Sequence, residues 1–274
     1  MTARTILITG CSSGIGRDAA VTLARRGWTV LATCRRPEDC EALRAEGLES
    51  FPLDLADPAS VAAAPNRVRE LTGGTLDALF NNGAFALPGA LEDLPRDGLQ
   101  SIFETNVFGT HDLTRRLLPL MGRGARIVTC SSVLGYVALP WRGAYVATKY
   151  ALEGWSDVLR LELRDRGIHV VLIEPGAIAT RIRVNAVPHF ERWIDWQASA
   201  RAEQYRRELL PRLYAPPKRD RFELGPAAVT AALIRALEAR RPRPRYRVTL
   251  PARGVALLRR VLSTRLLDRV LLPR

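Results

Sequence analysis

Residues 4–27, RTILITGCSSGIGRDAAVTLARRG, decide the fold of this chain. The apolar run 4–10 predicts a buried parallel strand, and the glycine-rich turn after it opens a helix that ends at Gly27. The first amides of such a helix, together with its dipole, attract phosphate. The strand–turn–helix order therefore predicts a dinucleotide-binding turn, made by Gly10, Ser12, Ser13, Gly14, Ile15 and Gly16.

Strand and helix patterns alternate from this turn onward. Further strands are expected at 28–34, 48–54, 76–82, 125–132 and 168–176, and a last one at about 246–250. We expect the helix before residue 72 to bend or restart at Pro65, and the helix that contains Tyr145 to run to about Arg166. This alternation predicts an α/β fold, a single-domain Rossmann-type doubly wound parallel sheet of about seven strands with helices on both faces.

Three regions are expected within one domain of residues 1–274. Residues 1–180 form the cofactor and catalytic core. Residues 181–222 interrupt the alternation with aromatic residues and prolines, and we interpret them as a variable substrate lid. Residues 223–274 contain a helix, the last strand and a basic amphipathic helix.

The charge is concentrated at the end of the chain. Residues 240–274 hold eleven arginines and a single acid, Asp268, and they account for most of the net charge of +13. Because the body is nearly balanced, no nucleic-acid partner is expected. Four scattered cysteines without ligand spacing predict no metal site. The chain shows no leader and no long apolar run, so we expect a cytoplasmic protein.

The segment from Arg253 to Leu272 has leucines and valines on one face and arginines on the other. Such a helix either docks on the protein or a partner subunit, or lies in a membrane interface, drawn to anionic lipid. Both alternatives are open. If the second holds, the cytoplasmic protein is expected to contact the inner face of a membrane peripherally.

Tyr145 and Lys149, in GAYVATKYALEG at 143–154, lie four residues apart on one face of a predicted helix. A tyrosine hydroxyl titrates at about 10, and a neighbouring ammonium favours its ionised form. The pair can therefore transfer a proton near neutral pH.

Several motifs occur together in a fixed order: TGxxxGIG at 9–16, Asn81-Asn82-Gly83-Ala84, Ser132, Tyr145 with Lys149, and Pro175-Gly176. As a set, over residues 4 to about 180, they resemble the short-chain dehydrogenase/reductase family. The sequence is most similar in appearance to bacterial NADP-dependent aldehyde and ketone reductases, with hydroxysteroid- and retinol-dehydrogenase-like relatives. The order Gly83-Ala84 departs from the usual Asn-Asn-Ala-Gly.

The resemblance implies a catalytic set. Ser132 hydrogen-bonds the substrate oxygen, Tyr145 is the general acid or base, and Lys149 binds the nicotinamide ribose and lowers the pKa of Tyr145. Asn106 kinks its helix and holds a water that links Lys149 to solvent. Strand alternation points either Ser131 or Ser132 into the cleft, and we choose Ser132.

The resemblance also implies cofactor contacts. The second strand ends in Arg35-Arg36 where an acid would select NAD, and guanidinium groups suit a phosphate. We therefore expect NADP(H) in preference to NAD(H). The remaining contacts are expected at Asp54, Leu55, Asn81, Asn82, Gly83, Pro175, Gly176, Ile178 and Thr180, besides Tyr145 and Lys149.

The expected substrate is an apolar aldehyde, ketone or alcohol. Its pocket is expected to be lined by Phe85, Leu134, Trp141 and Trp193 as well as Ser132. The lid aromatics can equally pack against the sheet edge. The alternatives are an epimerase or dehydratase, and a catalytically silent dinucleotide-binding or lipid-associated module. The family resemblance implies a homodimer or homotetramer.

Overall fold

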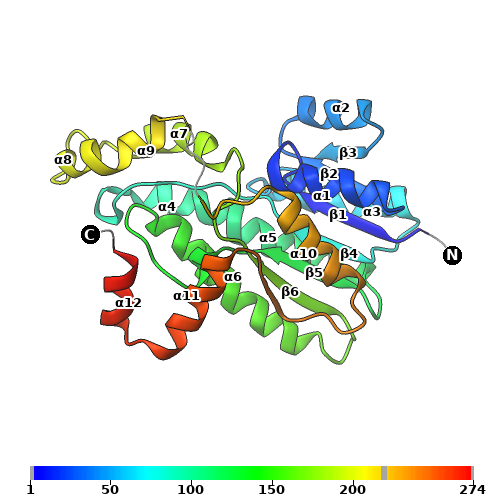
Figure 1. The fold of residues 1–274 in the computed structure, drawn as a ribbon. Helices are drawn as coiled ribbons and strands as arrows, with labels where there is room; N and C mark the ends of the chain where they lie inside the picture. Colours follow the sequence, from blue (N-terminus) through cyan, green and yellow to red (C-terminus); the bar gives the residue numbers. More distant parts are fainter. Residues whose placement is uncertain (1–2, 217–220, 273–274) are drawn as a thin grey trace.

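Seven parallel strands form one sheet at the centre of the computed structural model, which describes residues 3–216 and 221–272 (Figure 1). Their spatial order is β3-β2-β1-β4-β5-β6-β7, so the chain reverses direction across the sheet between β1 and β4. The predicted fold class is confirmed. The strands are β1 (Thr5–Thr9), β2 (Thr29–Cys34), β3 (Glu49–Pro52), β4 (Ala78–Asn81), β5 (Arg126–Cys130), β6 (His169–Glu174) and β7 (Arg245–Arg247).

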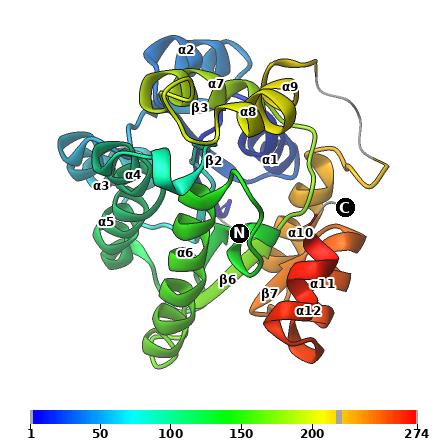
Figure 2. The same ribbon diagram turned by 90° about the vertical axis from the view of Figure 1, so that its left-hand side faces the viewer.

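Helices cover both faces of the sheet, as Figure 2 shows in end view. One apolar core lies between the strands and α1 (Gly14–Arg25), α2 (Pro37–Ala45) and α10 (Ala227–Glu238). The other lies under α3 (Pro58–Thr72), α5 (Gly109–Leu117) and α6 (Gly143–Glu162). Burial on both faces explains why the central strands are almost entirely apolar.

Two helix predictions need correction. α3 is one helix through Pro65, which is buried inside it, so there is no restart at this proline. α6 ends at Glu162 rather than Arg166. After Leu163 the chain turns through Gly167, whose φ of 68° favours glycine, and it enters β6 at His169.

The long helix after β4 is continuous but changes its winding. It consists of α4 (Arg96–Phe103), a π-helical turn η2 (Glu104–Phe108), α5 and a 3₁₀ turn η3 (Leu118–Leu120). π-turns of this kind often occur at functional sites. Asn106 lies in the middle of this one.

The region predicted as the lid forms helices that pack on α4 and the loops around it (Figure 2). Tyr205 is completely buried, donates a hydrogen bond to Asp93 Oδ2 over 2.8 Å and accepts one from the Ala90 amide over 2.8 Å. The packing alternative therefore holds for Tyr205. The helices are α7 (Ile182–Trp193), α8 (Ala202–Gln204), η5 (Tyr205–Leu209) and α9 (Leu210–Tyr214); 217–220 of this region lie outside the described residues.

The basic C-terminal segment forms two helices, so the prediction of a single one is wrong. α11 (Leu250–Val261) and α12 (Thr264–Leu271) are separated at Leu262, whose backbone is extended. Ser263, a residue type favoured at helix starts, begins the second helix. Thr249, expected at the end of the last strand, instead caps α11 by accepting from the Ala252 amide. No helix in the described part of the chain is long and apolar enough to cross a membrane.

Candidate active site

The loops after β1 and β4 meet where the strand order reverses. The Thr9 hydroxyl accepts hydrogen bonds from the Asn82 and Gly83 amides over 3.0 and 2.8 Å, and Asn82 Nδ2 donates to the Thr9 carbonyl over 2.9 Å. A Cβ on Gly10 would lie 2.8 Å from the Gly83 Cα. The backbones therefore touch, which accounts for the glycine at position 10.

The N-terminus of α1 is open toward this crevice. Ser13 precedes the helix and its side chain makes no capping hydrogen bond, so the first amides of the helix are free to bind an anion. A Cβ on Gly16 would lie 2.2 Å from the Gly10 carbonyl oxygen, so no larger residue fits there. The turn of residues 10–16 thus fits a dinucleotide pyrophosphate, with Ser12, Ser13 and Ile15 among its residues.

The two arginines after β2 differ in their partners. Arg36 donates two hydrogen bonds of 2.9 Å to the Asp39 carboxylate. Arg35 is exposed and has no ion-pair partner among the described residues, and its charge contributes to lowering the pKa of His189, which burial lowers most. Arg35 is the one of the pair that is available to a phosphate.

The predicted adenosine contacts are placed around the same crevice. Asp54 accepts a hydrogen bond from the Ala56 amide, and Leu55 packs beneath Gly83. Asn81 is buried and donates to the Thr114 hydroxyl over 3.0 Å, so its side chain points toward α5. Asn81 Oδ1 is buried with no partner in the described part of the chain.

The motif after β6 closes the crevice from the other side. The Pro175 carbonyl accepts from the Val133 amide over 2.8 Å, and Gly176 lies against the Thr249 hydroxyl. Ile178 pairs with Leu224, while Thr180 approaches Gly14 so closely that a Cβ there would lie 3.2 Å from its methyl group. Of the nicotinamide-binding residues expected here, Thr180 faces the glycine turn.

The two serines after β5 point in different directions. Ser131 is buried, with its hydroxyl directed toward Glu153. Ser132 is half-buried, accepts a hydrogen bond from the Leu134 amide over 3.1 Å, and lies close enough to Tyr145 for its side chain to lower the pKa of the phenol. This is the arrangement that the choice of Ser132 requires.

Tyr145 and Lys149 lie together on the buried face of α6. Lys149 Nζ is 5.4 Å from the centroid of the Tyr145 ring and donates to the Cys130 carbonyl over 2.8 Å. Burial raises the pKa of Tyr145, whereas the Ser132 hydrogen bond and the Arg142 charge lower it. Burial also lowers the pKa of Lys149. Arg142 therefore adds a positive charge that favours the phenolate.

Asn106 connects the π-turn to the catalytic helix. It exchanges two hydrogen bonds of 3.0 Å with the backbone of Phe85 and donates to Thr148, one residue before Lys149, over 3.2 Å. The side chain is buried. Its place in the middle of the helix is therefore explained by contacts and not by solvent exposure.

The predicted substrate residues are distributed over several walls. Phe85 stacks on His189 of α7 with ring centroids 3.9 Å apart. Leu134 packs with residues of α11 and α12. Trp141 donates to Glu208 over 2.9 Å and lies 4.7 Å from the Tyr205 ring. Trp193 instead packs on Gly98 of α4, with its Nε1 buried and unpaired among the described residues.

Sequence reasoning missed two features of this site. Arg142 precedes α6 by one residue, is half-buried, and has no ion-pair partner in the described ranges. Trp141 has a φ of 66°, a left-handed conformation that is strained for a bulky residue. The charge of Arg142 three residues before Tyr145 was visible in the sequence, whereas the Trp141 backbone carried no signal. The described residues include no group of three or more His, Cys, Asp or Glu side chains that could hold a metal ion.

Comparison with known proteins agrees with this geometry. A family model described as short chain dehydrogenase matches residues 4–190. The oxidoreductase YbbO of Escherichia coli K12 is 43% identical over 271 residues, which cover 98% of this chain and 94% of YbbO. The 17-beta-hydroxysteroid dehydrogenase type 6 of Rattus norvegicus is 34% identical, covering 96% and 86% of the two chains. Retinol dehydrogenase 16 of Mus musculus is also 34% identical, covering 97% and 87%.

Solved structures have the same fold. A short chain dehydrogenase from Burkholderia cenocepacia in complex with NADP has a TM-score of 0.66 at 28% identity, covering 85% of this chain and 90% of its own. A short chain dehydrogenase/reductase from Burkholderia phymatum in complex with NAD has a TM-score of 0.77 at 24% identity, covering 98% and 95%.

Proposed function

This chain belongs to the short-chain dehydrogenase family, and we propose that it is a member that prefers NADP(H) and interconverts an apolar carbonyl compound with its alcohol. As a family member it is an oxidoreductase that acts on CH–OH and C=O groups with a nicotinamide dinucleotide. The cofactor preference, the catalytic role of Tyr145 and the substrate class are the proposed parts.

The observation that carries this proposal is the position of Tyr145, with the Ser132 side chain close to its hydroxyl and Lys149 Nζ 5.4 Å from the centroid of its ring. The nicotinamide supplies or accepts the hydride. The Ser132 hydroxyl donates to the substrate oxygen, on which negative charge grows as the carbonyl is reduced. Tyr145 donates its proton to that oxygen, and in the reverse direction it accepts the proton of the alcohol. Lys149 binds the ribose hydroxyls, and Asn106 holds the water that connects Lys149 to solvent.

Replacing Tyr145 with Phe tests the catalytic role. We expect Tyr145→Phe to lower turnover by about 10²- to 10⁴-fold, because general acid–base catalysis contributes on this scale. Cofactor affinity should change little. Tyr150→Phe is the matched control, since Tyr150 lies on the same helix but is exposed. Turnover retained in Tyr145→Phe would remove Tyr145 from this role.

The cofactor preference is proposed from Arg35, which is free to bind the 2′-phosphate. Arg35→Ala is expected to weaken NADP(H) binding by about 10- to 100-fold, the range for hydrogen bonds to a charged group. NAD(H) binding should hardly change. Arg36→Ala is the control, because Arg36 is already paired with Asp39. Unchanged NADP(H) affinity in Arg35→Ala would place the phosphate elsewhere, and equal losses for both variants would contradict the assignment of the phosphate to Arg35 alone.

The substrate class is proposed from the apolar walls and from the relatives. Leu87, Ala144 and Phe190 are buried in the cluster under the lid, and Phe85, Trp141 and Tyr145 pack against it. Two relatives are, by name, a hydroxysteroid dehydrogenase and a retinol dehydrogenase. Hydride-transfer assays with long-chain aldehydes, ketosteroids and retinal distinguish the candidates. Preference for small polar carbonyl compounds would contradict the proposal.

An assembly of two or four chains through α5 and α6 is also part of the proposal. Phe108, beside α5, and Val158 and Leu161, on α6, are large apolar side chains that are half or more exposed. Replacing Val158 and Leu161 with Gln should reduce the sedimentation mass. A wild-type monomer would contradict the assembly and leave the redox activity untouched.

A further inference from the structure

The outer face of α11 exposes its largest apolar side chains. Ala252 and Ala256 are buried against the protein, whereas Leu250, Leu257 and Val261 are 71%, 63% and 69% exposed. Seven- and four-residue spacings place these three on one stripe of the helix. At 3.6 residues per turn this stripe lies opposite the two alanines. The helix therefore buries Ala252 and Ala256 against the protein and presents Leu250, Leu257 and Val261 outward.

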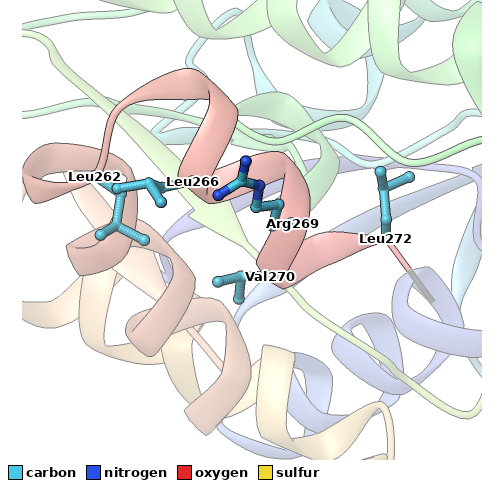
Figure 3. Close-up of a pocket in the computed structure, with 5 residues that line it drawn as sticks. All are labelled: Leu262, Leu266, Arg269, Val270 and Leu272. Carbon is cyan, nitrogen blue, oxygen red and sulfur yellow. The ribbon is translucent and has the colours of Figure 1, made fainter. Parts of the chain in front are cut away.

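The neighbouring helix α12 repeats this arrangement. Leu267 and Leu271 are half-buried and pack toward the loop after β5, while Leu266 and Val270, one turn apart, are exposed. An open hollow of about 460 Å³ lies beside α12 (Figure 3). It is bordered by Leu262, Leu266, Arg269, Val270 and Leu272, none of which belongs to the active site. We call Leu250, Leu257, Val261, Leu266 and Val270 the outer ridge.

Three arginines flank the outer ridge: Arg260, Arg265 and Arg269. None of them has an ion-pair partner within residues 3–216 and 221–272, whereas Arg259 lies on the opposite side of α11, over the ring of Tyr150. Arg245 and Arg247, by contrast, are paired with Glu174 over 3.0 and 2.9 Å. The positive charge at the ridge is thus left for a partner outside the described chain.

We propose that the outer ridge binds the surface of a membrane that contains anionic lipid. Leucine and valine side chains enter the boundary between headgroups and acyl chains, and the arginines contact the lipid phosphates. A second copy of the chain is a poorer occupant, because it would bring two uncompensated cationic segments together. Helices of 12 and 8 residues are too short to span, so they lie along the surface.

Vesicle co-sedimentation of the full chain tests the proposal. The probes are two kinds of vesicle. One is pure phosphatidylcholine, and the other also contains about 30% phosphatidylglycerol, which makes its surface moderately anionic. Binding is expected only with the anionic lipid, and it should weaken as salt is raised. Leu257→Gln with Val261→Gln should reduce binding at least about tenfold, since each buried aliphatic side chain contributes more than 1 kcal/mol. The matched control is Ile182→Gln with Val184→Gln, two exposed positions on α7.

Charge variants separate lipid attraction from apolar contact. Arg265→Gln with Arg269→Gln should weaken binding about 25-fold, or about fivefold per arginine. Arg206→Gln with Arg207→Gln removes the same charge from the lid and should leave binding within about twofold. No vesicle binding, equal binding to both vesicles, or equal losses in control and test variants would overturn the proposal. The proposal would also be overturned if the wild type did not bind vesicles and formed a dimer, while Leu257→Gln with Val261→Gln was a monomer.

Discussion

The glycine turn at β1 and the helix α11 use small residues in opposite ways. At the turn, Gly10 and Gly16 let backbone touch backbone, and nothing larger fits. On α11, Ala252 and Ala256 contact the protein while Leu250 and Leu257 face outward. Residue identity at the turn is therefore dictated by the protein's own backbone. Along the outer face of α11 no part of the protein packs against the side chains. The apolar residues there are therefore explained by the proposed membrane surface and not by the fold.

The same substitution, glycine to alanine, should have opposite effects in the two regions. In Gly16→Ala the new Cβ would lie 2.2 Å from the Gly10 oxygen, and we expect a loss of about 3 kcal/mol or more in unfolding free energy. In Gly254→Ala nothing lies within 4 Å of the new Cβ, and the exposed helix should gain up to about 1 kcal/mol.

Urea unfolding of both variants measures this contrast, and titration with NADP(H) provides a second readout. Gly16→Ala should lose cofactor affinity because the turn must move, whereas Gly254→Ala should retain it. If the two variants had the same stability, the turn would be as free to relax as the exposed helix, and the contrast would fail.

The sequence predicted those features that close packing determines. Each buried strand is an apolar run, and the glycines at 10 and 16 stand where backbones meet. Ser132 follows from alternation, because Ser131 continues the buried side of β5 toward Glu153. The sequence did not predict the end of α6 or the break at Leu262. Several nearby residues could end either helix, and tertiary contacts select one.

Within the site, long-range partners were beyond sequence reasoning. Tyr205 bonds Asp93 across 112 positions, and Trp141 reaches Glu208 across 67. A spacing rule covers a few turns of a helix and cannot pair such residues. The local pair of Tyr145 and Lys149, four residues apart, could be recognised. For the region predicted as the lid, the sequence indicated only its bounds and none of these contacts.

Glu174 lies where the sheet meets the C-terminal region. It ends β6 and is almost completely buried. Its carboxylate forms close ion pairs with Arg245 and Arg247, but these contacts do not have the geometry of hydrogen bonds. Burial, the larger effect, and the charge of Glu153 raise its pKa to about 7, against the ion pairs with the arginines. Because the pKa is raised in the folded state, the contribution of Glu174 to stability is fully present below its unfolded pKa of about 4.5. This contribution is lost as the pH rises through about 7.

Glu174→Gln should therefore flatten the dependence of stability on pH. Between pH 5 and 8 the wild type should lose up to about 3 kcal/mol relative to the variant, an upper bound from the pKa change. Urea unfolding at both pH values measures the difference. Glu41→Gln, at an exposed position of α2, is the control. A parallel pH dependence in Glu174→Gln and wild type would contradict the raised pKa.

Arginine also differs between the two regions, and this difference gives the smallest expected effect. Arg142 is half-buried and lowers the pKa of Tyr145, although burial, the larger effect, raises it. The arginines beside the outer ridge are exposed and far along the chain from Tyr145. Removing Arg142 should leave the phenolate less favoured.

Alcohol oxidation needs the ionised form of Tyr145 to accept a proton, so its rate rises with pH through the pKa of this residue. In Arg142→Ala the rising limb of the pH–rate profile should move to higher pH, with a fall of a few-fold (about two- to fivefold) on that limb. Arg265→Ala, the control from the ridge, should leave the profile unchanged. If Arg142→Ala changed KM alone and left the limb in place, Arg142 would act on the substrate rather than on the proton affinity of Tyr145.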